Sequence, residues 1–347
     1  CNSNNHQPGD KIRQVPHKLA KKNAPTTYTI QFVKEDVRYA YGLSYTSEKI
    51  ISEYLYYFPN GKQAKIFDRN MNEISFGDKF KKDFEMILNF MKPNKLFLSV
   101  SANYSAVKES ELVFLFFKED LIFYPLPLEI SNWLEYSIER FTKEPELKKI
   151  FIDFMKSVDT PIQSIDTKFE KKQMSPEFVP DNIPDEFKPF FVNAKEITRS
   201  EANINYGLFS VNLNEESKGI QKLFEVFGPI IDIILKDKVL IWDEMETSLH
   251  PRIVKEILRL IMYGKQDSKA QLIFSTHDTN LLDLNTFRRD QIWFTELNKG
   301  RETDIYSLAE LKNVRKDENI SKGYMNGKYG AIPFIHNPLV FPVEEGC

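Results

Sequence analysis

The chain has 347 residues, of which 41% are hydrophobic and 28% charged, which suits two globular domains or one large domain with an insertion. A formal net charge of −3 gives no support to nucleic-acid binding, and the short basic runs are typical of solvated surface. No window comes near the roughly 18 consecutive apolar residues that a membrane span needs, so no membrane partner is expected.

The only two cysteines are the terminal residues, Cys1 and Cys347. Such a pair forms neither a metal cluster nor a disulfide framework, so we expect a reducing, cytoplasmic location. The residues near the N-terminus are rich in Asn and Lys and lack the apolar core of a signal peptide.

The first elements in chain order are strands. Alternating or β-branched runs cover 27–33, 37–43 and 50–58, and the Asn60-Gly61 turn signal precedes another run at 64–67. These patterns predict an antiparallel meander with one buried face and one wet face.

Helical patterns follow. Apolar residues recur three to four apart from Lys79 to about Met91, which predicts a helix. The region from about 111 to 200 is aromatic and mostly helical in pattern, and its prolines from Pro161 onward indicate a loop-rich stretch. We interpret this region as an insertion or lid without a catalytic motif.

The last part of the chain has the pattern of an α/β domain, with apolar strands around an amphipathic helix. The expected elements are strand 205–213, a helix after 215–219, parallel strands 238–242 and 270–276, a helix from Pro251, and strands 291–294 and 304–308.

The two parallel strands end in residues that can carry chemistry. The first delivers Asp243 and Glu244, and the second delivers His277. Because open α/β sheets bind ligands at the carboxyl ends of their strands, these side chains are expected to meet. An acid pair can position Mg²⁺ and water for phosphoryl transfer. The alternative is that the acids only end a strand and that the histidine is structural.

A phosphate-binding loop is not found in the 347 residues. No Gly-x-x-x-x-Gly-Lys-Ser/Thr occurs, and the chain begins at Cys1 rather than Met. We therefore expect a fragment or processed product whose loop lies upstream of Cys1.

The order and spacing of these segments resemble the ABC-like ATPases grouped with abortive-infection and OLD-type ATP-binding proteins, within the AAA family ATPases. The resemblance is clearest from Glu215 to about Pro333. The matched motifs are the signature Glu216-Ser217-Lys218-Gly219, the Walker B segment Asp243 to Pro251, the switch segment Thr276-His277-Asp278 and the closing motif Tyr324 to Pro333.

The resemblance implies an α/β, P-loop NTPase-like (ABC-type) head with an antiparallel β subdomain and a helical insertion. The implied parts are an irregular segment 1–25, the β subdomain and helix of the head 26–110, a helical insertion or lid 111–200, the Walker B and signature half 201–337 and a tail 338–347.

The resemblance also implies a role for each matched residue. Asp243 would hold Mg²⁺ through its hydration shell, Glu244 would be the catalytic base, and His277 would contact the γ-phosphate. Ser217 and Gly219, at a helix N-terminus, would contact a γ-phosphate held by a second subunit. ATP and Mg²⁺ are thus the expected cofactors and a homodimer the expected assembly.

Some positions depart from the family pattern. Lys218 and Ile220 differ from a Leu-Ser-Gly-Gly-Gln signature, and Trp242 replaces the usual aliphatic residue before the acid and is expected to pack under a helix. His250 is interpreted as a turn or dimer-facing residue. No glutamine-loop residue can be assigned.

Three functions remain open at this point. The first is an ATP-dependent dimeric switch in a bacterial defence or DNA-related system, with any effector nuclease supplied in trans. The second is a non-catalytic interaction protein that keeps the ATPase fold.

The third is a metal-dependent hydrolase. Its ligands would be Asp243, Glu244, Glu246, His250 and His277. Glu246 and His250 are four residues apart, but Pro251 disfavours helical geometry at His250, which argues against this alternative.

The 347-residue chain is predicted to hydrolyse ATP poorly or not at all, because the cradle for the β- and γ-phosphates is missing from it. Phosphate release measured on the chain and on Glu244→Gln checks this. Turnover that the substitution abolishes would contradict the prediction.

Overall fold

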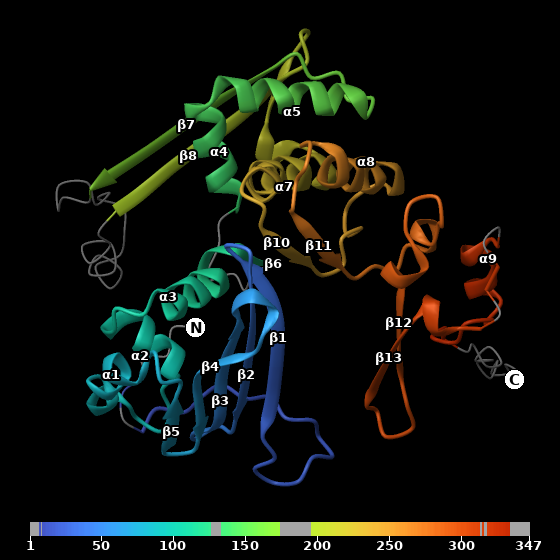
Figure 1. The fold of residues 1–347 in the computed structure, drawn as a ribbon. Coiled ribbons are helices and arrows are strands. Elements are labelled where there is room, and N and C mark those ends of the chain that lie inside the picture. The colour runs from blue at the N-terminus through green and yellow to red at the C-terminus, as the bar shows by residue number, and fades with distance from the viewer. Residues whose placement is uncertain are drawn as a thin grey trace, which may run out of the picture. The chain divides into compact units, whose positions relative to one another are not determined.

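The computed structural model describes residues 7, 9–125, 133–173, 196–312, 314–315 and 318–333. The chain divides into two compact units, whose elements are labelled in Figure 1. Unit 1 comprises Cys1–Leu121, Phe287–Glu318 and Lys322–Cys347, and unit 2 comprises Ile122–Thr286 and Asn319–Ser321. The predicted domain boundaries stay a prediction.

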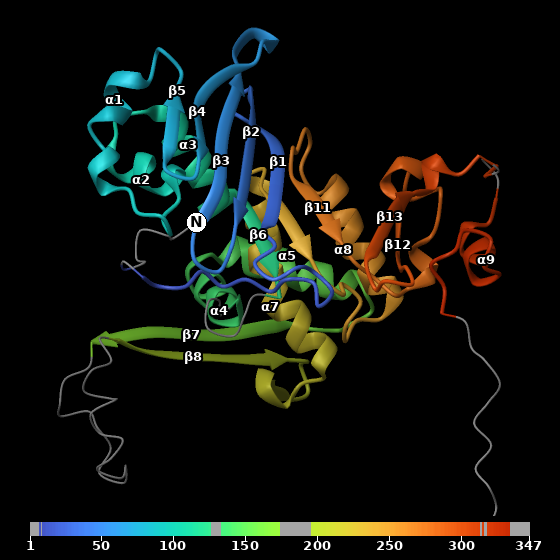
Figure 2. The ribbon, with the colours of Figure 1, turned by 90° about the horizontal axis from the view of Figure 1, so that it is seen from below.

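Unit 1 is built on a five-stranded antiparallel sheet whose strands follow one another in sequence order (Figure 2). The strands are β1 (Thr26–Lys34), β2 (Val37–Tyr45), β3 (Ile50–Phe58), β4 (Ala64–Asn70) and β5 (Glu73–Phe76). The predicted meander is confirmed, although β5 was not expected. Asn60 and Gly61 adopt φ values of 53° and 77°, which explains the turn residues there.

Short helices complete this part of unit 1. They are α1 (Lys81–Glu85), α2 (Phe97–Tyr104) and α3 (Lys108–Leu115), with 3₁₀ turns at Pro59–Gly61 and Leu88–Phe90 and a π-helical turn at Phe116–Asp120. The single helix expected over 79–91 is wrong, because the α-helix ends at Glu85. The short helix and the 3₁₀ turn bury Phe84 and Ile87 and leave Met86 66% exposed.

A second, two-stranded sheet in unit 1 is the antiparallel hairpin of β12 (Trp293–Leu297) and β13 (Thr303–Ser307), flanked by 3₁₀ turns at Arg289–Gln291 and Leu308–Glu310. Both strands were predicted; among the described strands they pair with each other and not with β10 or β11. Tyr324 and Tyr329 of the closing motif stack on Phe294 at 5.6 and 5.8 Å, so this motif has a packing role.

Unit 2 contains the predicted parallel pair. β10 (Val239–Trp242) and β11 (Gln271–Phe274) run parallel, and the sheet order is β11-β10-β6, with β6 at Leu121–Tyr124. The helices α7 (Lys218–Leu235) and α8 (Pro251–Tyr263) lie on the same side of this sheet in Figure 1. Pro251 occupies the first turn of α8, as expected.

The other described residues of unit 2 include two helices and an antiparallel sheet. These elements are α4 (Trp133–Lys143), α5 (Pro145–Ser157), β7 (Ser164–Gln173), β8 (Glu196–Asn205) and β9 (Ser210–Asn212), with 3₁₀ turns at Leu213–Glu215 and Thr279–Leu281. A short helix, α9, spans Ile320–Met325. Aromatic contacts join α4, α5 and α7: the ring centroids of Phe141 and Phe151 lie 4.9 and 5.5 Å from that of Phe224.

The interpretation of 111–200 as mostly helical is only partly correct. Residues 121–124 form a strand in the sheet that contains β10 and β11, and 164–173 form a strand where loops were expected. A four-residue apolar run is too short for its periodicity to separate strand from helix, which explains the error at β6. Residues 174–195 lie outside the described part of the chain.

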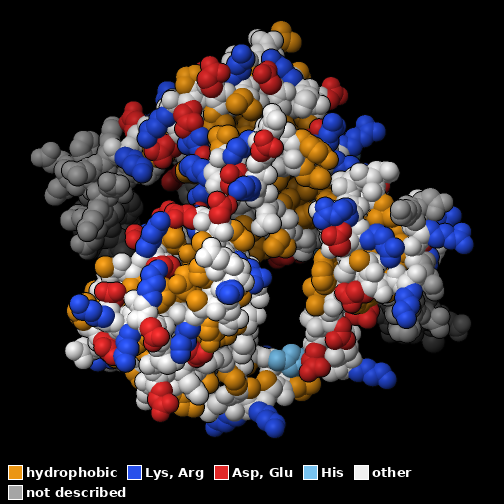
Figure 3. All heavy atoms as spheres, in the orientation of Figure 1, with side chains coloured by type: hydrophobic (Ala, Val, Ile, Leu, Met, Phe, Trp, Pro, Cys, Tyr) orange, Lys and Arg blue, Asp and Glu red, His pale blue; other side chains and the backbone are white. Residues whose placement is uncertain are grey.

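Charges of both signs are interspersed over the face shown in Figure 3, in agreement with the small net charge. Within the ranges that the structure describes, no helix combines the length and the apolar character needed to cross a membrane.

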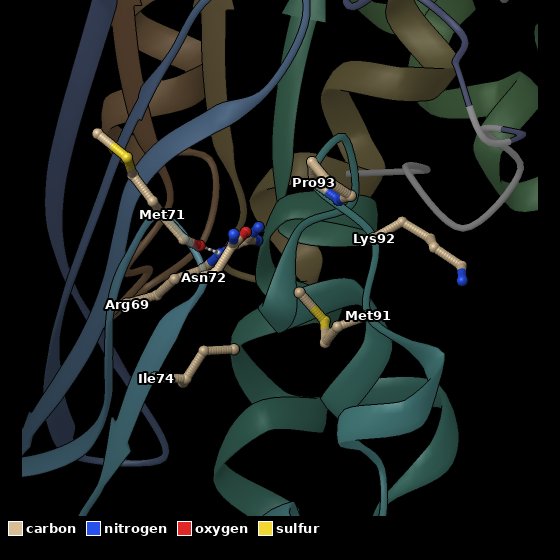
Figure 4. A pocket seen from close by; sticks show the side chains of 7 residues that line it. All are labelled: Arg69, Met71, Asn72, Ile74, Met91, Lys92 and Pro93. Atoms are coloured by element: carbon tan, nitrogen blue, oxygen red, sulfur yellow. Dashed lines mark hydrogen bonds between the residues drawn. The ribbon is translucent and has the colours of Figure 1, made fainter.

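A pocket of about 190 Å³ lies in unit 1 (Figure 4). Its lining residues are Arg69, Met71, Asn72, Ile74, Met91, Lys92 and Pro93. The Arg69 guanidinium donates to the carbonyls of Met71 at 2.8 Å and Lys95 at 2.6 Å. This buried cation therefore has a structural role in the wall of the pocket.

A buried carboxylate ties the meander to α2. Glu53 of β3 accepts hydrogen bonds from the amides of Phe97 at 2.6 Å and Leu98 at 2.9 Å, and from the Tyr41 hydroxyl at 3.0 Å. Arg69 lies 3.7 Å from the same carboxylate and is itself buried. Both charges of the pair are therefore away from water and depend on each other.

Glu53→Ala is predicted to destabilise unit 1 by about 3–5 kcal/mol, because it leaves the Arg69 charge buried without its partner. Urea unfolding followed by circular dichroism measures the change, with the exposed Glu48→Ala as control. Equal unfolding midpoints for both variants would contradict the assigned role of Glu53.

Candidate nucleotide site

The candidate site lies where β10 and β11 end. The Ser275 hydroxyl, one residue past β11, donates to Asp243 Oδ1 at 2.5 Å and accepts from the Glu244 amide at 2.8 Å. The Ser275 amide donates to the Trp242 carbonyl at 3.0 Å, which continues the pairing of the strands. The Ser275 side chain therefore contacts the Asp243 carboxylate and the Glu244 backbone, at the two positions that follow β10.

The chain turns sharply at Glu244, which adopts a left-handed φ of 49° that is uncommon for a non-glycine residue. The Thr247 amide donates to the Glu244 carbonyl at 3.0 Å, and the Met245 side chain is fully buried below the turn. Asp243 and Glu244 are consequently both exposed at the edge of the sheet. A backbone strained in this way is often found where a site needs a fixed geometry.

The loop that carries His277 is tied to this turn by Glu246. The His277 amide donates to Glu246 Oε1 at 2.7 Å, while the His277 side chain is exposed. Burial acts to raise the pKa of Glu246, but the hydrogen bonds, chiefly the one from the His277 amide, outweigh it and lower that pKa. The structure thus brings Asp243, Glu244 and His277 to one edge, as predicted from their positions after parallel strands.

Ser217 and Gly219 stand at the start of α7. The Ser217 hydroxyl caps this helix of 18 residues by accepting from the Ile220 amide at 3.3 Å. A Cβ on Gly219 would lie 3.1 Å from the Ser248 carbonyl, so the signature adjoins the turn after the acid pair. Among the described residues, no hydrogen bond joins the signature to the acid pair itself.

His250 has a local structural role. Its Nδ1 accepts from the Arg252 amide at 3.2 Å and caps α8, in extended rather than helical geometry. It therefore does not share a helix face with Glu246, on which the hydrolase alternative depended. No group of three or more His, Cys, Asp or Glu side chains suited to a metal ion occurs in the part of the chain that is described.

Two positioning residues, Ser275 and Glu246, were not singled out for this role from the sequence. Ser275 is the first polar residue at the end of β11, and that place in the pattern is the signal that could have found it. The role of Glu246 depends on a loop-to-loop contact that no local pattern reveals.

Parallel strands that present an acid pair at their carboxyl ends, with helices on one side, form an α/β domain with a candidate ligand site at that edge. The sequence profile of the family described as "AAA domain, putative AbiEii toxin, Type IV TA system" matches residues 18–283, well over half of the chain. The chain belongs to this family.

Among solved structures, the chain is similar to one titled "Crystal structure of the SmcHead bound to the C-winged helix domain of ScpA". The sequence identity is 15%, the similarity covers 78% of this chain and 76% of that chain, and the TM-score is 0.31. No curated protein matches the chain.

Family membership and the mixed α/β architecture confirm the predicted fold class, P-loop NTPase-like, and an ATPase type of nucleotide-binding function. Use of a nucleotide and Mg²⁺ follows for such a domain in general. The roles of Asp243, Glu244, His277, Ser217 and Gly219 stay predictions.

Ser275→Ala is predicted to lower ATP turnover of the full-length protein about 10- to 100-fold, the usual effect of removing a residue that orients a catalytic or metal-binding group. Ser268→Ala is the matched control, since the Ser268 hydroxyl donates to the Ile234 carbonyl at 3.3 Å and to Asp237 at 3.4 Å, away from Asp243 and Glu244. Equal turnover in both variants would show that Ser275 does not position the acids.

Proposed function

We propose that this protein is an ATP-dependent dimeric switch, in which ATP joins two copies and hydrolysis separates them. The observation that carries the proposal is the Ser275 hydroxyl, which holds Asp243 and the Glu244 amide together at the ends of two parallel strands. Membership of an AAA family supports ATP as the ligand of this edge.

The residues at this edge suit Mg²⁺. Asp243 and Ser275 offer exposed carboxylate and hydroxyl oxygens, the type of ligand that this hard cation prefers. When bound with ATP, Mg²⁺ would supply neutralisation of phosphate charge. Asp243 would hold the hydrated ion, with its carboxylate oriented by Ser275.

Glu244 is the proposed general base. Its amide donates to Ser275, which fixes its backbone, and its exposed carboxylate accepts a hydrogen bond from the Thr247 hydroxyl at 3.5 Å through Oε2. The other carboxylate oxygen would accept a proton from water. His277 would donate a hydrogen bond to a γ-phosphate oxygen from a backbone fixed by Glu246.

Ser217 and Gly219 are proposed to act on nucleotide held by the second copy. The start of α7 offers backbone amides and the positive end of the helix dipole to an anion. If a nucleotide contacts residues of both copies, it binds the dimer more tightly than the monomer. Nucleotide binding would then shift the equilibrium toward the dimer.

The biological setting is part of the same proposal. The family description names a putative AbiEii toxin and a type IV TA system, which favours a bacterial defence role in the cytoplasm. An effector, such as a nuclease, would act in trans. Nucleic-acid binding by this chain itself has no support from its net charge of −3.

Glu244→Gln is expected to trap an ATP-bound dimer of the full-length protein, because binding is kept while the base is lost. Light scattering after size-exclusion chromatography, with and without ATP, measures the mass. The double variant Glu244→Gln/Ser217→Arg, which crowds the signature, should stay monomeric. A Glu244→Gln monomer that ignores ATP would count against the switch and favour a non-catalytic interaction protein.

A further inference from the structure

Lys222 of α7 is half-buried beside the end of β6. Its Nζ donates to the Tyr124 hydroxyl at 2.6 Å and lies 4.2 Å from the centre of that ring. The same ammonium is 5.9 Å from the centre of the Trp242 ring, at the outer limit of a cation–π contact. Lys222 thus reaches from the signature helix to the residue that precedes Asp243.

Tyr124 connects this lysine to the acid pair. Its backbone carbonyl accepts the Asp243 amide at 2.8 Å, directly at the end of β10. Its ring stacks on Trp133 at 4.2 Å and meets Trp242 edge-on at 5.4 Å. All three rings are buried, so Tyr124 cannot move without disturbing the backbone of Asp243.

Partial burial of the Lys222 ammonium group costs free energy, because it removes the charge from water. Burial lowers the pKa of Lys222, and the carboxylate of Glu225 opposes this only in part. A methionine could fill the same space without burying an ammonium group. The hydrogen bond to Tyr124 and the charge of Glu225, which also hydrogen-bonds the Tyr124 hydroxyl, therefore distinguish lysine from an apolar residue here.

We propose that Lys222 is a positioning residue that couples the signature helix to the acid pair through Tyr124. Ser217 lies five residues earlier, roughly 7.5 Å along the axis of α7. A shift of α7 caused by an anion at Ser217 would be passed through the Tyr124 hydroxyl to the Asp243 backbone. The consequence for turnover depends on the proposed function, whereas the coupling itself does not.

Hydrogen exchange of the Asp243 and Glu244 amides tests the coupling without nucleotide. Lys222→Met removes the donor, Tyr124→Phe removes the hydroxyl, and each keeps the bulk of the side chain. Exchange should become about tenfold faster in either single variant, as for the loss of one hydrogen bond to a charged group. In the double variant, exchange should be no faster than in the single variants, because both remove the same contact. Lys222→Arg should restore slow exchange.

The matched controls are Lys236→Met and Tyr136→Phe. Both residues hydrogen-bond Asp232, which lies on α7, the helix of Lys222, but near its C-terminal end. Unchanged exchange in Lys222→Met and Tyr124→Phe, additive effects in the double variant, or equal effects in the controls would overturn the proposal.

A second measurement separates this proposal from the proposed function. In the full-length protein, Lys222→Met should lower kcat for ATP with little change in KM, since the contact orients a group and binds no substrate. Unchanged kcat would overturn the positioning role. A wild-type protein with neither turnover nor an ATP-dependent dimer would refute the dimeric switch, and the exchange measurement would still decide the coupling.

Discussion

The candidate site depends on one hydroxyl group. Ser275 stands between the ends of two parallel strands, where it donates to the Asp243 carboxylate and accepts from the Glu244 amide. These two hydrogen bonds fix the positions of Asp243 and Glu244 relative to the ends of the two strands. Because charged partners strengthen hydrogen bonds, the contact to Asp243 is the stronger constraint.

Two neighbouring contacts extend this constraint to the residues around the acids. Glu246 holds the backbone of His277, and the Tyr124 carbonyl holds the amide of Asp243. Each contact joins segments far apart in sequence, and each leaves the side chain of a candidate site residue exposed while its backbone is bonded. A rigid backbone below exposed side chains is the arrangement that preorganised catalysis requires.

Local patterns predicted the parts of the fold with strong periodicity. The meander of unit 1, α7, α8 and the parallel strands were all expected, since apolar runs that stop at polar residues are visible without a structure. The acids and His277 were placed at one edge by the rule for parallel strands. The family resemblance then supplied their roles, which the fold alone does not assign.

The errors arose where tertiary contacts decide the outcome. β6 has only four residues, and its membership of the sheet depends on pairing with β10. The α-helix expected over 79–91 ends at Glu85 and a 3₁₀ turn follows at Leu88–Phe90, a break that the apolar spacing of three to four residues does not reveal. Ser275, Glu246 and Lys222 act through contacts with partners at least 31 residues away, which no window of sequence contains.

Calorimetric titration of the full-length protein with ATP tests most directly whether this edge of the sheet is a nucleotide site. We predict tight binding that requires Mg²⁺, and a marked loss of this Mg²⁺ dependence in Asp243→Asn. ATP binding that is equally tight with and without Mg²⁺, and unchanged by Asp243→Asn, would contradict this prediction.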